Sequence, residues 1–140
     1  MDLWGRARRL RAHGEEGQTL LETAIAFPVL LLVALALVQF ALYYHAESVV
    51  TGATQDGARV AAAEDSGIAA GVAHTQALLQ AGLGRSATGV AVQGVDGGDT
   101  VEIETQGSLK LIIPWVGGGS LPLRARSVMS KERFRVGAGG

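Results

Sequence analysis

The sequence predicts an α+β fold in which a long N-terminal transmembrane helix continues into a soluble domain with a second short helix and three or four antiparallel strands. Three observations lead to this prediction. An apolar run without a formal charge extends from Thr23 to Tyr44. Small apolar residues then keep helical spacing up to Ala63, and apolar and polar residues alternate from Thr88 onward.

The apolar run has the length and surroundings of a single membrane span. A helix over it would be about 33 Å long, enough for the hydrocarbon core of a bilayer. Pro28 lies inside it and is expected to kink or loosen the helix, because proline removes a backbone hydrogen bond. The run is longer than the h-region of a secretory signal, and no A-x-A-like cleavage site follows it. Phe40, Tyr43 and Tyr44 are typical of an interfacial aromatic anchor.

A basic flank before the span sets its expected orientation. Such flanks stay in the cytoplasm, so the C-terminal part of the chain should lie outside it. The flank consists of Arg6, Arg8, Arg9 and Arg11. We therefore divide the chain into a polar leader, a membrane and assembly helix, an extracytoplasmic domain and a flexible tail, at residues 1–17, 18–44, 45–135 and 136–140.

Two helices are expected outside the leader. The first should begin near Gln18 or Thr19 and continue past the membrane to Ala63, with a face of small residues that suits a close neighbour. That face contains Ala46, Val49, Val50, Ala53, Gly57, Val60 and Ala61. The second helix should run from about Gly67 to Leu83, with Ser66 as its cap.

Strands follow the second helix. A turn at Asp96–Asp99 separates two alternating runs, which predicts a hairpin. A second turn is expected at Gly117–Gly119, followed by a last strand. The residues expected on one face of that strand are Leu121, Leu123, Ala125, Ser127 and Met129.

Composition argues against several classes of function. The net charge of −1 gives no general nucleic-acid footprint, and the absence of cysteine excludes disulfides and thiol chemistry. His13, His45 and His74 lie in different segments without metal-ligand spacing. We therefore expect no catalytic residue, no metal and no cofactor, and the chain is not predicted to be an enzyme.

A basic C-terminal edge leaves two interpretations open. It is either a charged edge that resists aggregation or a contact for an acidic partner or an anionic surface. Its members are Arg124, Arg126, Lys131, Arg133 and Arg135.

The boundary between leader and span carries the residue that most needs an explanation. Glu22 stands at the start of the apolar run, where an acidic side chain is costly and usually functional. The simpler interpretation is that Glu22 rests at the level of the lipid headgroups. Gly17 favours a functional one, because glycine, four residues, glutamate and then an apolar helix resembles the class III signal of type IV prepilins.

This resemblance implies cleavage by a prepilin peptidase between Gly17 and Gln18, with Glu22 as the fifth residue of the mature chain. Cleavage would create an α-amino group on Gln18 that is normally charged at neutral pH. In a bundle of helices, the carboxylate of one subunit can then meet the amine of a neighbour, and leaving either charge alone would be costly.

Within the prepilin-like proteins the chain resembles the TadE-like family, over about residues 15–63. The resemblance rests on the segments 17–28 and 56–62, and the strand at 123–132 is similar in character. It implies a minor pilin or pseudopilin of the tight-adherence (Tad/Flp) system, since Flp major pilins are much shorter. Implied partners are the membrane, a prepilin peptidase, the Flp pilin, a TadF-like subunit and, indirectly, the Tad platform and ATPase.

One departure and three alternatives accompany this resemblance. Many type IV pilins carry an N-methylated phenylalanine after the cut, whereas Gln18 follows it here. The alternatives are an unprocessed single-span anchor that presents a small binding domain, a type II secretion pseudopilin, and an enzyme with an outward-facing site, for which no residue cluster argues. The mature N-terminus separates the first from the pilin interpretation.

Overall fold

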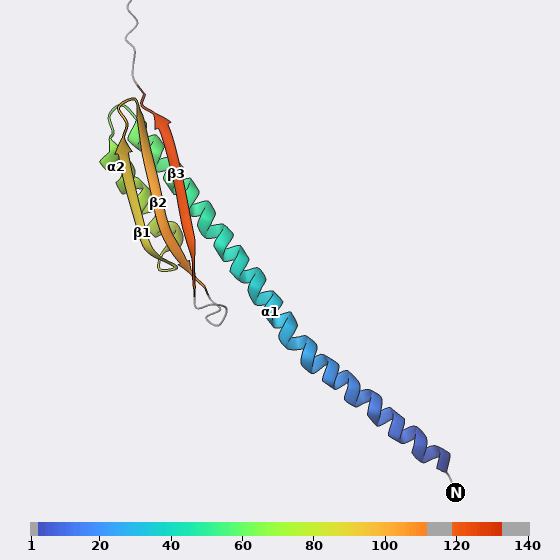
Figure 1. The fold of residues 1–140 in the computed structure, drawn as a ribbon. Coiled ribbons are helices and arrows are strands. Elements are labelled where there is room, and N and C mark those ends of the chain that lie inside the picture. Colours follow the sequence, from blue (N-terminus) through green and yellow to red (C-terminus); the bar gives the residue numbers. More distant parts are fainter. Residues whose placement is uncertain (1–2, 112–118, 133–140) are drawn as a thin grey trace, which may run out of the picture. The chain divides into compact units, whose positions relative to one another are not determined.

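The computed structural model of the chain has the predicted α+β architecture (Figure 1). It describes residues 3–111 and 119–132, with side chains described from Gly17 onward. Its elements are α1 (Leu3–Ala62), α2 (Ile68–Leu83), β1 (Ala87–Asp96), β2 (Thr100–Lys110) and β3 (Ser120–Ser130). The chain divides into two compact units, Met1–Val38 and Gln39–Gly140, and we call the described part of the second unit the head.

The start of α1 differs from the prediction. The helix begins at Leu3, whereas a start near Gln18 or Thr19 was expected. The leader is rich in leucine, alanine, arginine and glutamate, which are strong helix formers. Each of its glycines costs a helix only about 1 kcal/mol, so favourable neighbours outweigh them.

The three strands form one antiparallel sheet in the order β1-β2-β3. The predicted hairpin between β1 and β2 is confirmed, with Gly97 N–H donating to the carbonyl of Thr100 at 2.9 Å. Gly98 adopts a φ of 86° in this turn, which only glycine adopts without strain. Asp96 accepts a hydrogen bond from Gly98 N–H, which closes the turn.

The connection from β2 to β3 is described only at its ends. Lys110 and Ser120 are paired across the two strands, and Leu111 N–H donates to the carbonyl of Gly119 at 3.4 Å. Most of the glycine turn predicted at Gly117–Gly119, and the predicted continuation of the strand to Ile113, lie outside the described residues.

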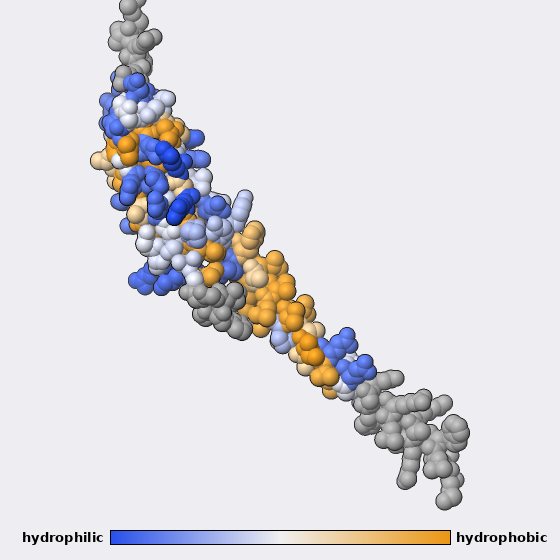
Figure 2. All heavy atoms as spheres, in the orientation of Figure 1, coloured by the Kyte–Doolittle hydropathy of each residue, from blue (hydrophilic) through white to orange (hydrophobic). Residues whose placement is uncertain are grey.

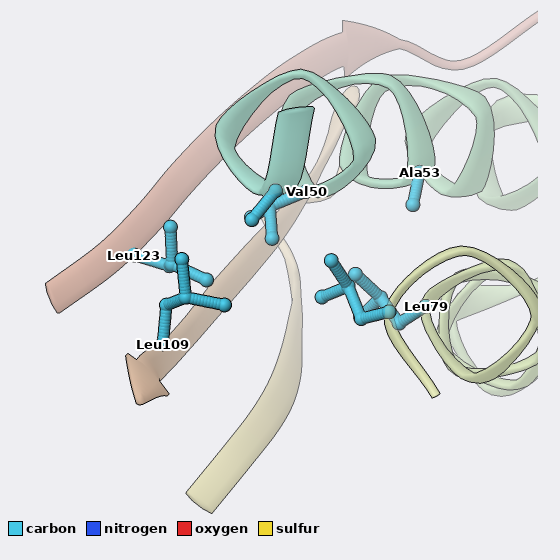
Figure 3. Close-up of a cluster of buried hydrophobic side chains, with 7 residues drawn as sticks. Val50, Ala53, Leu79, Leu109 and Leu123 are labelled. Carbon is cyan, nitrogen blue, oxygen red and sulfur yellow. The ribbon is translucent and has the colours of Figure 1, made fainter. Parts of the chain in front are cut away.

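The helices supply one side of the head core and the sheet supplies the other (Figure 1). In the first cluster, Val50 and Ala53 of α1 lie against Leu79 of α2 and against β2 and β3 (Figure 3). The members of this cluster are Ala46, Val50, Ala53, Leu79, Leu83, Leu109 and Leu123. A second cluster contains Ala58, Ala61, Ala62, Val101 and Ile103. The face predicted for the last strand is confirmed for Leu123, which is buried, and for Ala125 and Met129, which pack against the two clusters.

The small-residue face of α1 is explained by a close crossing with α2. A Cβ atom added at Gly71 would lie 2.5 Å from the carbonyl oxygen of Gly57 and 2.6 Å from the Cβ of Ala61. A Cβ added at Gly57 would overlap the hydroxyl of Thr75. The two helices therefore approach each other at glycine residues, and the crossing leaves no room for a larger side chain at Gly57 or Gly71.

Helix α2 corrects the sequence prediction at its cap. Its N-cap is Gly67 without a side-chain cap, whereas Ser66 was expected in that role. Its buried positions include the small residues Gly71 and Thr75, whereas Ala73 is exposed. Gly71 and Thr75 are buried because α2 crosses α1 there, and the close crossing favours small side chains whatever their hydropathy.

Buried threonines contribute polar contacts to the core. Thr54, Thr75 and Thr105 are completely buried. The hydroxyl of Thr54 lies 2.7 Å from the carbonyl oxygen of Val50 and 2.8 Å from the hydroxyl of Thr105. With one donated and one accepted bond, Thr54 links α1 to β2 and leaves no buried hydroxyl unsatisfied there.

A cluster of contacts fastens the end of β3 to the hairpin and to α1. Lys131 Nζ lies 2.7 Å from both carboxylate oxygens of Asp96, and its backbone N–H donates to the carbonyl of Asp99. The next residue, Glu132, donates its N–H to the carbonyl of Ala62. The hydrogen bond from Lys131, and then that from Gly98, hold the pKa of Asp96 below its ordinary value of 3.8.

We predict that Gly71→Ala destabilises the head by about 1–3 kcal/mol through overpacking. Gly52→Ala is the matched control, because Gly52 also lies inside a helix and an added Cβ there meets nothing within 4 Å. Both variants gain the same helix propensity, so their difference isolates the crossing. Thermal unfolding of the full chain in detergent, followed by circular dichroism, measures this difference. Equal melting temperatures for the two variants would contradict the close crossing.

We predict that the Asp96–Lys131 pair stabilises the head at neutral pH and that acid removes this contribution. Because the pKa of Asp96 is lowered on folding, the stabilisation is complete above 3.8 and is lost as pH falls through the lower folded value. Asp96→Asn should therefore reduce stability at pH 7 and make no difference at the acid end. Urea unfolding across this pH range tests the prediction, with Asp65→Asn as a control outside the pair. A pH-independent difference would refute it.

Candidate functional site

The described part of the first unit is an apolar helical surface that the chain leaves uncovered. Large side chains such as Leu20, Phe27 and Leu37 are 65–71% exposed. Figure 2 shows the hydrophobic residues that gather along this part of α1. Among the described residues, one helix is long and apolar enough to cross a membrane. An exposed apolar surface of this extent requires lipid or other protein chains to cover it.

Gly17 is a glycine that the fold does not require. It lies inside α1 without a positive φ, and a Cβ atom added to it meets nothing within 4 Å. In this respect it contrasts with Gly57 and Gly71 of the head. A glycine here costs helix stability without a packing benefit among the described residues, as is also the case for Gly52.

Glu22 carries the only formal charge between Gly17 and His45. Its side chain is exposed, and no hydrogen bond or ion pair engages it among the described residues. Gln18 lies four positions earlier, so the two residues share a helix face. The segment thus presents one carboxylate at the edge of an apolar surface, next to the backbone that cleavage after Gly17 would expose.

The neighbouring polar residue in the apolar run is satisfied locally. Thr23 donates its hydroxyl to the carbonyl of Thr19 at 2.9 Å, which allows it to enter an apolar environment without an unpaired hydroxyl. Pro28 lies inside α1, and the helix is continuous on both sides of it. The predicted kink at Pro28 stays a prediction.

The aromatic residues at the end of the span have two different environments. Phe40 and Tyr44 are 68% and 64% exposed, as an interfacial anchor requires. Tyr43 is half-buried and packs against the first core cluster of the head. The packed unit begins at Gln39, so the last residues of the apolar run also belong to the head.

Two other predicted features can be placed in the head. The described residues contain no group of three or more potential metal ligands. On the basic C-terminal edge, Arg126 donates to Glu102 on the neighbouring strand at 2.8 Å, and this pairing raises the pKa of Arg126. Arg124 is exposed, whereas Arg133 and Arg135 lie outside the described residues.

Sequence reasoning did not single out Arg85 and Lys110. They line one groove together with Leu42 of the apolar run. Arg85 follows α2 and Lys110 ends β2, so only the packing of the head brings them together. No local pattern in the sequence joins residues so far apart.

The fold and this segment define a class of protein with one helix able to cross a membrane and an α+β head. Residues 17–59 match the family model described as TadE-like protein. The resemblance predicted from the sequence is thereby confirmed over this segment. No curated protein and no solved structure matches the chain.

Proposed function

We propose that the chain is a minor pilin or pseudopilin of a Tad/Flp pilus system, cleaved by a prepilin peptidase between Gly17 and Gln18. The observation that carries this proposal is the spacing of Gly17 and Glu22 at the mouth of the exposed apolar helix. The family match begins at Gly17 and leaves residues 1–16 outside it, which supports a boundary at this position.

The environment of Gly17 supports a role in recognition by a peptidase. Among the described residues, no atom lies within 4 Å of a Cβ added at this position. A peptidase must bring the scissile backbone close to its catalytic groups, and glycine permits such an approach. The demand for glycine would then arise from the enzyme that acts on the chain.

Glu22 would act during assembly with other subunits. The α-amino group of Gln18 appears only after cleavage and lies on the same helix face as Glu22. When α1 packs against neighbouring helices, the carboxylate can pair with the amine of another subunit. In an apolar setting, a misaligned neighbour would leave both charges uncompensated, so the pair selects one register.

The exposed apolar surface supplies the rest of the proposed function. Before assembly lipid would cover residues 23–38, and after assembly the same surface would contact the helices of Flp pilin and TadF-like subunits. The basic leader would hold the N-terminus in the cytoplasm, near the Tad platform and its ATPase, with the head outside. The role is structural, and we assign no enzymatic activity to the chain.

We predict that Gly17→Phe blocks removal of the leader. The wild-type chain, co-expressed with a prepilin peptidase, should begin at Gln18, whereas the variant should begin at Met1, because a bulky side chain prevents approach of the scissile backbone. N-terminal sequencing and intact mass measure both outcomes. Gly52→Ala removes a different glycine from α1 and should be cleaved normally.

Two outcomes would contradict the cleavage proposal. A wild-type chain that keeps Met1 in the presence of the peptidase would favour an unprocessed anchor. A Gly17→Phe chain that loses its leader at the wild-type rate would remove Gly17 from recognition. A type II secretion pseudopilin would share the cleavage and differ in the subunits that it captures.

We predict that Glu22→Ala leaves cleavage intact and weakens capture of pilin subunits at least about tenfold, since loss of one member of a desolvated ion pair costs more than 1.4 kcal/mol. Co-purification of the Flp pilin from membranes measures capture. Glu47→Ala is the control, because Glu47 is also an exposed glutamate of α1 but lies beyond the apolar run. Equal capture by both variants would exclude the proposed role of Glu22.

A further inference from the structure

A groove in the head combines apolar walls with basic side chains. It has a volume of about 270 Å³ and is formed by α1, the end of α2 and the end of β2. Leu42, Leu83 and Leu111 contribute apolar surface. His45, Arg85 and Lys110 also line it, and we call this site the basic groove.

The charged side chains that line the basic groove are all positive. Its lining includes one arginine, one lysine and one histidine, and no aspartate or glutamate. Arg85, Lys110 and His45 are all exposed, so the charged ends of Arg85 and Lys110 are accessible to a ligand. Arg126 and Lys131 pair with carboxylates elsewhere in the head, whereas no salt bridge within the described residues involves Arg85 or Lys110.

The position of the basic groove along α1 relates it to the membrane. Leu42 belongs to the apolar run, and His45 directly follows the last residue of that run, Tyr44. These residues lie in the same compact unit as Arg85 and Lys110. Because a helix rises about 1.5 Å per residue, the groove lies within about one turn of the end of the span. Lipid phosphates are found at this depth in a bilayer.

We propose that the basic groove binds the headgroup of an anionic phospholipid of the membrane that holds α1. Arg85 and Lys110 would contact the phosphate, and the apolar walls would contact the upper part of the acyl chains. The inference rests on the membrane insertion contained in the proposed function, but it requires neither cleavage nor pilus assembly. An arginine can bind phosphate oxygens in a bidentate manner and a lysine acts as a point charge, so the pair suits this ligand.

Lipid binding at this site would set the position of the head at the membrane surface. The groove contains residues of α1, α2 and β2, so one bound headgroup would contact all three elements at the level of the lipid phosphates. The interaction would favour one rotation of α1 about its own axis.

The test uses the full, uncleaved chain in nanodiscs of phosphatidylcholine alone and in nanodiscs that also contain phosphatidylglycerol. Anionic lipid that binds the folded head should raise its melting temperature by about 4 °C, and added salt should reduce the rise. Arg85→Gln combined with Lys110→Gln should abolish the rise and leave the melting temperature in phosphatidylcholine unchanged. Arg59→Gln combined with Arg124→Gln removes the same charge elsewhere and should keep it.

Three results would overturn the proposal. The first is a wild-type chain whose melting temperature is the same in both kinds of nanodisc. The second is an equal loss of the rise in the Arg59/Arg124 control, which would indicate a general charge effect. The third is the same rise produced by inorganic phosphate in phosphatidylcholine nanodiscs, which would assign the groove to a free anion. Each result leaves the cleavage after Gly17 untouched, so the two proposals fail separately.

Discussion

The close approach of α1 and α2 at Gly57 and Gly71 is the constraint on which the packing of the head depends. At this crossing the backbone of one helix contacts the backbone of the other, and any added methyl group meets an atom that cannot move away. With the helices this close, both can contribute to one core against the same three-stranded sheet. The described part of the head contains no cysteine, and it combines this close crossing with larger buried side chains such as Leu79 and Ile103.

The same helix meets opposite requirements in its two parts. From Gln39 onward the buried face of α1 is covered by α2 and the sheet. The buried hydroxyls of Thr54, Thr75 and Thr105, one each from α1, α2 and β2, would be costly if unpaired. In the described residues before Gln39, large apolar side chains are exposed along α1 and require lipid or other protein chains to cover them. The glycines of α1 therefore differ in their surroundings. Gly57 permits a close contact with α2, whereas Gly17 makes no close contact among the described residues.

Charged residues mark both ends of the exposed apolar run of α1. Glu22 stands where the apolar surface begins, and the basic groove lies where it ends. The ion pairs Asp96–Lys131 and Glu102–Arg126 join residues of the sheet and of the segment that follows it, and neither pair includes a residue that lines the basic groove. If both proposals hold, the apolar helix carries an assembly charge at one end and a lipid contact at the other. Together these would define how the subunit is presented within the membrane.

Periodic and local features of the chain were sufficient to predict the α+β class, the hairpin at Asp96–Asp99 and the small-residue face around Ala53. These features depend on the regular spacing of side chains along one helix or strand, and the family resemblance likewise depends on the contiguous segment that begins at Gly17. Only the tertiary structure decided which glycines lie at a close contact, that Thr54 meets Thr105, and that Arg85 and Lys110 line one groove. The residues of each pair are distant in sequence, and only the packing of the whole head brings them together.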